Sequence, residues 1–344
     1  MDRKVAETKG FILVATLWVL AGLGLLASYV DGLTDQNVQR ALLHKQNIQH
    51  ELDLYSTQAT LVYLFATSRM NDRALILEEK QRLVRLDSDV IVPGRTAREI
   101  LLDDTVYSGL GDVLFSIQDE GGLASVNSHD FPMFSGMLRS IGLSESARSL
   151  ITGRLQDYTD ANQVLSLNGA EYFEYRQKQL PLPADGLMKS PLELRKLLGF
   201  SELLTAQQWA DLRPYLTMRQ ATGYNFNVMP KEVLMALFGN QQAVVQAIIS
   251  LREGERIYSV PQIERATGKR FNLDDQDMRQ FPSSAIRMSL WQKNSRRRTL
   301  SGVEFTPFEE SSAWRTDYHY SEQHDEAVNE QDSEQVRDAP TALL

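Results

Sequence analysis

An uninterrupted apolar stretch near the N-terminus constrains this chain most. Residues 11–30 read FILVATLWVLAGLGLLASYV and contain no charged side chain. Twenty residues in an α-helix extend about 30 Å, which is enough to cross the hydrocarbon core of a bilayer. Arg3, Lys4 and Lys9 precede the stretch, and positive flanks tend to stay in the cytoplasm. The sequence therefore predicts one transmembrane helix, with all later residues on the far side of the membrane.

The residues at the start of this stretch carry a cleavage motif. Gly10 followed by Phe11-Ile12-Leu13 resembles the class III leader of type IV pilins and type II secretion pseudopilins. The resemblance implies that a prepilin peptidase cuts between Gly10 and Phe11 and methylates the new amino terminus. An ordinary secretory signal has a shorter apolar core and a cleavage site behind it. The alternative on the leader alone is an uncleaved signal anchor.

The fifth residue of the expected mature chain departs from most pilins, because it is Ala15 where they carry Glu. A carboxylate inside the membrane is costly unless it has a partner. In the family, that Glu pairs with the terminal amine of a neighbouring subunit. Its absence is typical of the minor pseudopilin K of type II secretion, in the general secretion pathway protein K family. The resemblance implies a position at the tip of the pseudopilus.

Composition sets further bounds on the part beyond the membrane. The 344 residues are enough for a two-part periplasmic portion, and the absence of cysteine excludes disulfides and thiolate chemistry. The net charge of −9 argues against a nucleic-acid partner, which calls for a basic face.

The first half of the chain predicts helices and one strand. The N-terminal helix is expected to continue over residues 31–70 and to lay an apolar stripe on the head. Residues 73–102 suggest a second helix broken at Val92-Pro93-Gly94, and 112–118 alternate as in a strand. The stripe consists of Leu42, Leu43, Ile48, Leu52, Leu54, Leu61, Tyr63, Leu64 and Phe65.

Two later stretches, 124–155 and 225–252, look like distant copies of one another. Each has an Asn, a Leu-rich helix, a Gly turn and a second helix: Asn127 with Gly142, and Asn227 with Gly239. The second copy resembles the helix-hairpin-helix family. Its turn has one glycine in place of Gly-x-Gly and no basic cluster beside it, which favours a packing module over DNA binding.

The same region strengthens the resemblance to minor pseudopilin K. Residues 225–230, NFNVMP, match an Asn-x-Asn-Thr-Ala-Pro segment of that family apart from its Thr and Ala. Residues 190–194, SPLEL, and 198–200, LGF, also match. With the leader, these matches cover most of residues 10–290.

The predicted fold class is α+β: a long N-terminal transmembrane helix on a small antiparallel, pilin-like sheet, with a large inserted all-helical domain containing helix-hairpin-helix-like repeats. The predicted divisions are leader 1–10, transmembrane helix 11–30, pilin-like helix and first strands 31–123, helical insertion 124–282, returning strands 283–320 and a disordered acidic tail 321–344. Within the returning strands, 286–291, 303–305 and 315–320 have the composition to pair with 112–118.

A group of oxygen-bearing side chains is the best candidate site. Asp157, Asp160 and Asn162 lie close together, and Glu171 follows nine residues later. Calcium takes six to eight oxygen ligands, so the segment predicts a calcium loop. Minor pseudopilin K has Asp-Trp-Ile-Asp-x-Asp and Gly-Ala-Glu-Asp stretches here, and the resemblance implies calcium. Asn162 and Tyr172 replace acids, which implies weaker binding or one ion fewer; the alternative is a set of turn caps without metal.

Catalysis has no support in the sequence. His44, His50, His129, His319 and His324 show no metal-ligand spacing, and neither a phosphate loop nor a nucleophile elbow occurs. The chain is therefore expected not to be an enzyme.

The resulting hypothesis is a structural minor pseudopilin that caps the tip of the type II secretion pseudopilus and helps to initiate its assembly and protein export. It is expected in the bacterial inner membrane as a single-pass protein with a periplasmic head. Expected partners are minor pseudopilins I and J, H or the major pseudopilin below, and the prepilin peptidase, with no nucleic acid. The alternatives are a minor pilin of a type IV, mannose-sensitive haemagglutinin-like system, and a DNA-uptake protein.

Overall fold

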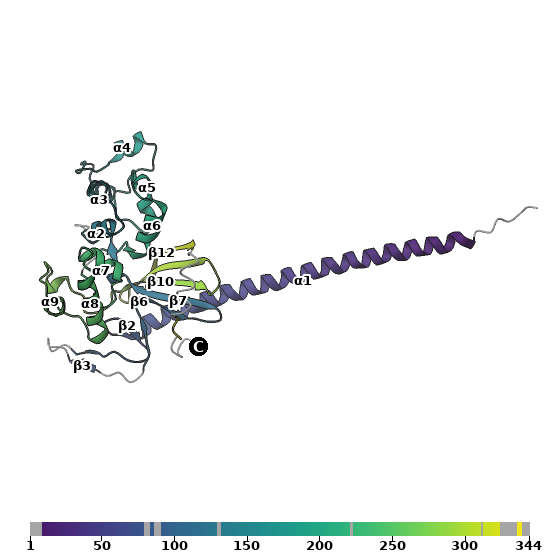
Figure 1. The fold of residues 1–344 in the computed structure, drawn as a ribbon, viewed down its shortest axis with the longest axis horizontal. Coiled ribbons are helices and arrows are strands. Elements are labelled where there is room, and N and C mark those ends of the chain that lie inside the picture. The colour runs from purple at the N-terminus through teal and green to yellow at the C-terminus, as the bar shows by residue number, and fades with distance from the viewer. Residues whose placement is uncertain are drawn as a thin grey trace, which may run out of the picture. The chain divides into compact units, whose positions relative to one another are not determined.

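The computed structural model describes residues 9–78, 83–85, 91–128, 132–220, 223–310, 312–323 and 336–338. The chain separates into two compact units, Met1–Tyr55 and Ser56–Leu344 (Figure 1). The leader residues 1–8 lie outside the described residues.

The first unit consists of the greater part of helix α1, Lys9–Thr67. This helix is long and apolar enough to cross a membrane, by length and composition, over a span that starts at Leu13. Leu17 and Trp18 are 65% and 72% exposed, so the apolar side chains of this unit are uncovered within the described part of the unit. Such a surface requires lipid or other helices around it.

The last members of the apolar stripe on α1 are buried within the second unit. Leu61, Leu64 and Phe65 are buried, and Phe65 stacks on Phe305 with ring centroids 4.3 Å apart. The earlier members Leu42, Leu43, Ile48 and Leu52 belong to the first unit and are all more than half exposed, and their contact with the head stays a prediction. Apolar residues at helical spacing indicate that one face of the helix packs against something. They do not indicate whether that partner is part of the same chain.

The second unit begins with short strands where a second helix was expected, so the prediction for 73–102 is wrong. Strands β1 (Arg69–Met70), β2 (Ala74–Ile76) and β5 (Glu99–Leu101) form an antiparallel sheet. Strands β3 (Leu83–Arg85) and β4 (Ile91–Pro93) form a separate antiparallel ribbon. Apolar runs of three residues are ambiguous between helix and strand, and here backbone pairing over a distance decides.

A five-stranded antiparallel sheet has the order β12-β11-β10-β7-β6. Four of its strands confirm the predicted segments: β7 (Val113–Asp119), β10 (Ala285–Gln292), β11 (Arg297–Phe305) and β12 (Trp314–Gln323). The fifth, β6 (Asp103–Ser108), was not predicted. The neighbours β7 and β10 are far apart in sequence, and the helical region lies between them in the chain. The α+β fold class is confirmed.

Part of the expected disordered tail is ordered. Strand β12 continues to Gln323, and the backbone N–H and C=O of Arg337 bond to Val106 and Ser108 of β6, both at 3.0 Å. The prediction is therefore wrong for residues 321–323 and for Arg337. Strand pairing holds these residues where local composition alone favours disorder. Residues 324–335 and 339–344 lie outside the described residues.

The helical region packs around one apolar core that includes the fully buried Phe134, Phe200 and Phe226. It is entered at β8 (Ala124–Ser125), which pairs in parallel with β9 (Leu216–Thr217). Its helices are α2 (Pro132–Ser140), α3 (Glu145–Thr159), α4 (Tyr172–Gln177), α5 (Phe200–Leu203), α6 (Ala206–Leu212), α7 (Lys231–Leu237), α8 (Gln242–Gly254) and α9 (Val260–Thr267), with single turns η1 (Glu120–Gly122), η2 (Pro191–Lys196), η3 (Arg213–Tyr215) and η4 (Asp275–Asp277).

Two asparagines hold the backbone in the same way in the two copies suggested by the sequence. Asn127 accepts from the N–H of Met188 and donates to its C=O, and Asn227 does the same with Ile257. Both asparagines are buried, so each amide replaces a strand neighbour for one residue. The first helices of the copies, α2 and α7, approach closely: a Cβ on Gly136 would stand 2.7 Å from the carbonyl oxygen of Ala236.

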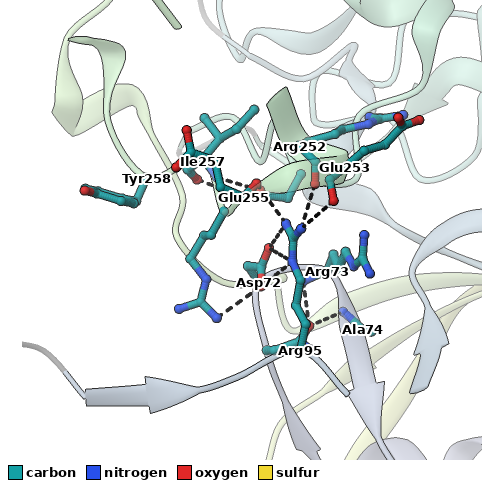
Figure 2. A network of polar contacts seen from close by, with 12 residues as sticks. Asp72, Arg73, Ala74, Arg95, Arg252, Glu253, Glu255, Ile257 and Tyr258 are labelled. Carbon is teal, nitrogen blue, oxygen red and sulfur yellow. Dashed lines mark hydrogen bonds and ion pairs between the residues drawn. The ribbon is translucent and has the colours of Figure 1, made fainter. Parts of the chain in front are cut away.

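A buried ionic network joins the short strands to the end of α8 (Figure 2). Asp72, whose side chain is fully buried, pairs with Arg95 at 2.6 Å and with Arg256 at 3.1 Å. Arg95 also donates to the carbonyl oxygens of Arg252 at 2.7 Å and Glu255 at 3.2 Å. A cation at the C-terminus of a helix satisfies carbonyls that have no partner within the helix. This network therefore fixes α8 to the segment that carries β2 to β5.

Candidate metal centre

Three carboxylates meet where α3 ends and α4 begins. Asp157 lies in the last turn of α3, Asp160 is the residue that caps its C-terminus, and Glu171 precedes α4. One oxygen from each lies within 4.8 Å of the others. This separation suits side chains that share one cation, because oxygen ligands stand 2.3–2.6 Å from calcium.

The loop between the helices is folded tightly against Asp157. The backbone N–H of Ser166 donates to both oxygens of the Asp157 carboxylate at 3.2 Å. A Cβ on Gly169 would stand 1.9 Å from Asp157 Oδ2, so only glycine lets the backbone approach the carboxylate this closely. Asp157 is fully buried, and an ionised group in that position needs compensation from donors or a cation.

Glu171 is the least compensated of the three acids. It is 5% exposed, and the backbone N–H of Glu174 is directed at its carboxylate in a capping box, although neither carboxylate oxygen makes a hydrogen bond of good distance and angle among the described residues. Burial, followed by the negative charges of Asp157, Asp160, Asp185 and Glu174, raises the pKa of Glu171 to about 7. A buried carboxylate with so little hydrogen bonding, among other acids, fits a site that a cation completes.

The donor set determines which ions fit. The chain has no cysteine, and the clustered side chains offer only carboxylate oxygen. Such hard oxygen ligands select calcium, magnesium or manganese over zinc or copper. Asp157, Asp160 and Glu171 would hold the ion, with the remaining positions left for backbone oxygens or water.

Asn162, the fourth residue of the predicted calcium loop, does not belong to this cluster of carboxylates. Its side chain is exposed, and its Oδ1 accepts from the N–H of Val164 at 2.7 Å as part of a turn. For Asn162 this bond agrees with the alternative of a turn cap without metal. The backbone N–H of Asn162 donates to Asp160 at 3.1 Å. Asn162 thus shapes the loop beside the acids in this arrangement.

Two further acids, which the sequence pattern did not single out, interact with Glu171. Glu174, in α4, accepts from the N–H of Glu171 at 3.0 Å, and Asp185 adds its charge from beyond α4. Asp185 has a positive φ of 46°, which marks a tight turn. Spacing along the chain gives no signal for Asp185, because the fold of the loop after α4 decides its position.

The remaining candidate residues have no such cluster. Gly10 and Phe11 lie in the first turns of α1, and their side chains are outside the described part. His44 and His50 lie on α1, and His129 and His324 are outside the described residues. His319 bonds to Ser301 at 2.8 Å, which follows from their opposed positions on β12 and β11; Ser301 is fully buried and offers no access to a substrate.

The apolar N-terminal helix, the antiparallel sheet and the helical region with its acid cluster define the class of membrane-anchored, pilin-like subunits. Residues 114–221, about a third of the chain, match the family model for type II secretion system (T2SS), protein K. The match spans the three carboxylates and supports the prediction of a minor pseudopilin K, the family that the leader and the Asn segments resemble.

The chain is also similar to a chain in the crystal structure of the GspK-GspI-GspJ complex from the type 2 secretion system of enterotoxigenic Escherichia coli. The identity is 14% and the TM-score 0.48, with 81% of this chain and 99% of that chain covered. No curated protein matches the chain.

Proposed function

We propose that the chain is a non-enzymatic minor pseudopilin that caps the tip of the type II secretion pseudopilus and helps to start its assembly. The observation that carries this proposal is the match of residues 114–221 to protein K of this system. Ala15 supports it, because a subunit without the intramembrane Glu cannot make the pairing that a repeating subunit uses. The helical region supports it as well, since so large a head would obstruct a subunit stacked on it.

Its proposed partners are minor pseudopilins I and J, with H or the major pseudopilin beneath them. The apolar part of α1 would lie in the inner membrane before assembly and among sister helices afterwards, with the head in the periplasm. The test is co-purification of the full chain, in detergent, with tagged subunits I and J of the same bacterium. A stable complex of the three is expected. Recovery with the subunits of a type IV pilus, and none with I and J, would favour the pilus alternative.

Calcium is the proposed ion of the carboxylate cluster. It would neutralise Asp157, Asp160 and Glu171 and so fix the loop that joins α3 to α4. Titration calorimetry of the full chain, with magnesium as the comparison ion, measures this directly. Calcium heat that is lost in an Asp157→Asn variant supports the site. Identical traces for the native chain and the variant would reject the site and leave the tip role untouched.

A further inference from the structure

Residues 336–338, which we call the strap, lie along the outer edge of β6. The N–H of Arg337 donates to the carbonyl oxygen of Val106, and its C=O accepts from the N–H of Ser108, both at 3.0 Å. The two segments run in the same direction, with Arg337 beside Tyr107. The strap therefore pairs with β6 as a further strand would, although it comes from the far end of the chain.

The strap is attached through a single residue. Among the described residues, both backbone hydrogen bonds between the strap and β6 belong to Arg337. The guanidinium of Arg337 also interacts with the hydroxyl of Tyr107, a side chain that is 2% exposed. These contacts are few compared with the pairing of a full strand, which extends over several residues. Another strand could therefore displace the strap.

The part of β6 that the strap covers is the part best suited to pair with another chain. Strand β6 is the outermost strand of the five-stranded sheet, and such a strand presents backbone N–H and C=O groups along its free edge. Its first half is irregular, because the register with β7 shifts between Asp103 and Val106 and Asp104 has a positive φ of 66°. The second half, residues 106–108, pairs regularly with β7 and carries no charge.

The strand at the opposite edge of the sheet is protected by other means. Strand β12 contains the charged residues Arg315, Asp317 and Glu322, and its register with β11 shifts between Gly302 and Val303. Charged side chains and bulges are the usual features that keep an edge strand from pairing with another chain. Residues 106–108 have neither feature, so the strap provides this protection for β6.

We infer that the strap keeps two copies of this chain from pairing through their β6 strands. Once the strap is released, residues 106–108 can pair antiparallel with the same residues of a second copy, about a two-fold axis. No like charges would oppose one another there, because Val106, Tyr107 and Ser108 are uncharged. The strap is thus an intramolecular strand that competes with an intermolecular one. This role goes beyond capping the tip and does not depend on it.

The test compares full-length and strapless chains in detergent by native mass spectrometry over a range of protein concentrations. Arg337→Pro removes the N–H that bonds to Val106, and a chain that ends at Gln335 lacks the strap entirely. Val336→Pro is the matched control, because neither bond to β6 uses the N–H of Val336. Both strapless chains are expected to contain about ten times more dimer than the native chain and the control, as the loss of two backbone hydrogen bonds implies. Association through α1 is common to all the chains and cancels in the comparison.

Hydrogen exchange locates the contact in these chains. The backbone N–H of Ser108 should exchange about tenfold faster in dilute Arg337→Pro than in the native chain, because its acceptor is lost. It should regain protection at high protein concentration, where β6 strands pair. Adding Val106→Lys to Arg337→Pro places a positive charge on both edges and should restore the native level of dimer.

Fluorescence of the buried Trp209 and Trp291 verifies that each variant is folded. Folded strapless chains that stay at the native level of dimer would overturn the inference. Dimers in which Ser108 stays unprotected, or which Val106→Lys does not reduce, would overturn it as well. Co-purification with I and J reports separately on the tip role.

Discussion

Glu171 combines three properties: burial, little hydrogen bonding to its carboxylate and several acidic neighbours. Its oxygens therefore gain little from ionisation in the metal-free chain, and they are already in position for a cation. The free energy of unfolding should consequently respond to pH and to calcium in opposite directions.

Without metal, the pKa of Glu171 rises to about 7 on folding from an ordinary value near 4.5, so the folded state holds its proton more tightly. Its contribution to stability is complete below the unfolded pKa and is lost as the pH rises through about 7. The loss is about 3.5 kcal/mol at most, because each tenfold change in proton affinity between the two states corresponds to about 1.4 kcal/mol, and 4.5 to about 7 is two and a half such steps. The measurement is thermal unfolding in chelator between pH 4 and 8, taken as the difference between the native chain and Glu171→Gln.

In saturating calcium the sign of this difference should reverse, because calcium binds the ionised carboxylates and competes with protons. Glu171→Gln is expected to equal or exceed the native chain in stability in chelator at pH 8. It should lose the calcium-dependent gain, which is about 2.7 kcal/mol at a hundred times the dissociation constant. Glu202→Gln, an exposed acid of α5, is the control and should change neither value. A parallel response of the two variants would contradict the site.

The sequence predicted which acids meet at the site, but it did not predict the residues and hydrogen bonds around them. Asp157, Asp160 and Glu171 are near enough along the chain for their spacing to suggest a shared ion. The contribution of Asp185 depends on how the chain returns after α4, and the turn bond that occupies Asn162 depends on the loop. Neither can be read from spacing, because each is decided by contacts outside the motif.

Among the elements, α8 depends on a residue more than 140 positions before it. Arg95 joins the buried carboxylate of Asp72 to the carbonyl oxygens at the end of α8 (Figure 2). Breaking a buried ion pair on one side leaves the other charge without compensation, which costs more than the pair contributes. The network therefore links the stability of the helical region to that of the short strands.

Arg95→Met is expected to lower the free energy of unfolding by about 2–3 kcal/mol, somewhat less than a fully orphaned charge, since Arg256 still pairs with Asp72. Tryptophan fluorescence during denaturation of the full chain measures it, because Trp209 and Trp291 are buried in the second unit. Lys196→Met is the control: its pair with Glu193 spans 3.7 Å and is half exposed, so at most about 1 kcal/mol should be lost. Equal effects would refute a special role for Arg95.

Long elements, and elements whose contacts are close in sequence, were predicted best. The long apolar helix and the strands β7, β10 and β12 follow from periodicity, and the region between β7 and β10 reads as helical. Residues 73–102 were misassigned because three-residue strands such as β2 and β5 leave too short a pattern. Their identity comes from partners on other strands, which local sequence does not contain.

At the scale of the whole molecule, the proposed function begins with processing at Gly10. In cells with the prepilin peptidase, the full chain is expected to lose residues 1–10 and to carry a methyl group on Phe11. Gly10→Val should block both changes, because the resemblance places the cut directly after this glycine. Gly22→Ala, within the apolar stretch and with free space around it, is the control and should be processed normally. Intact-mass spectrometry gives the answer, and native chain that retains its leader would exclude the pseudopilin assignment.

The parallel pairing of β8 with β9 has a consequence for how such a head can vary. Ala124 and Leu216 stand opposite one another in this pairing, as do Ser125 and Thr217, and both strands run in the same direction. The residues between the two strands, including the acids of the candidate site, thus begin and end one strand spacing apart, about 4.8 Å. A relative that joined the end of β8 directly to the residue after β9 would keep the direction of its backbone. Exchange or enlargement of the part of this segment beyond α2 would therefore leave the sheet and the contact of α2 with α7 in place.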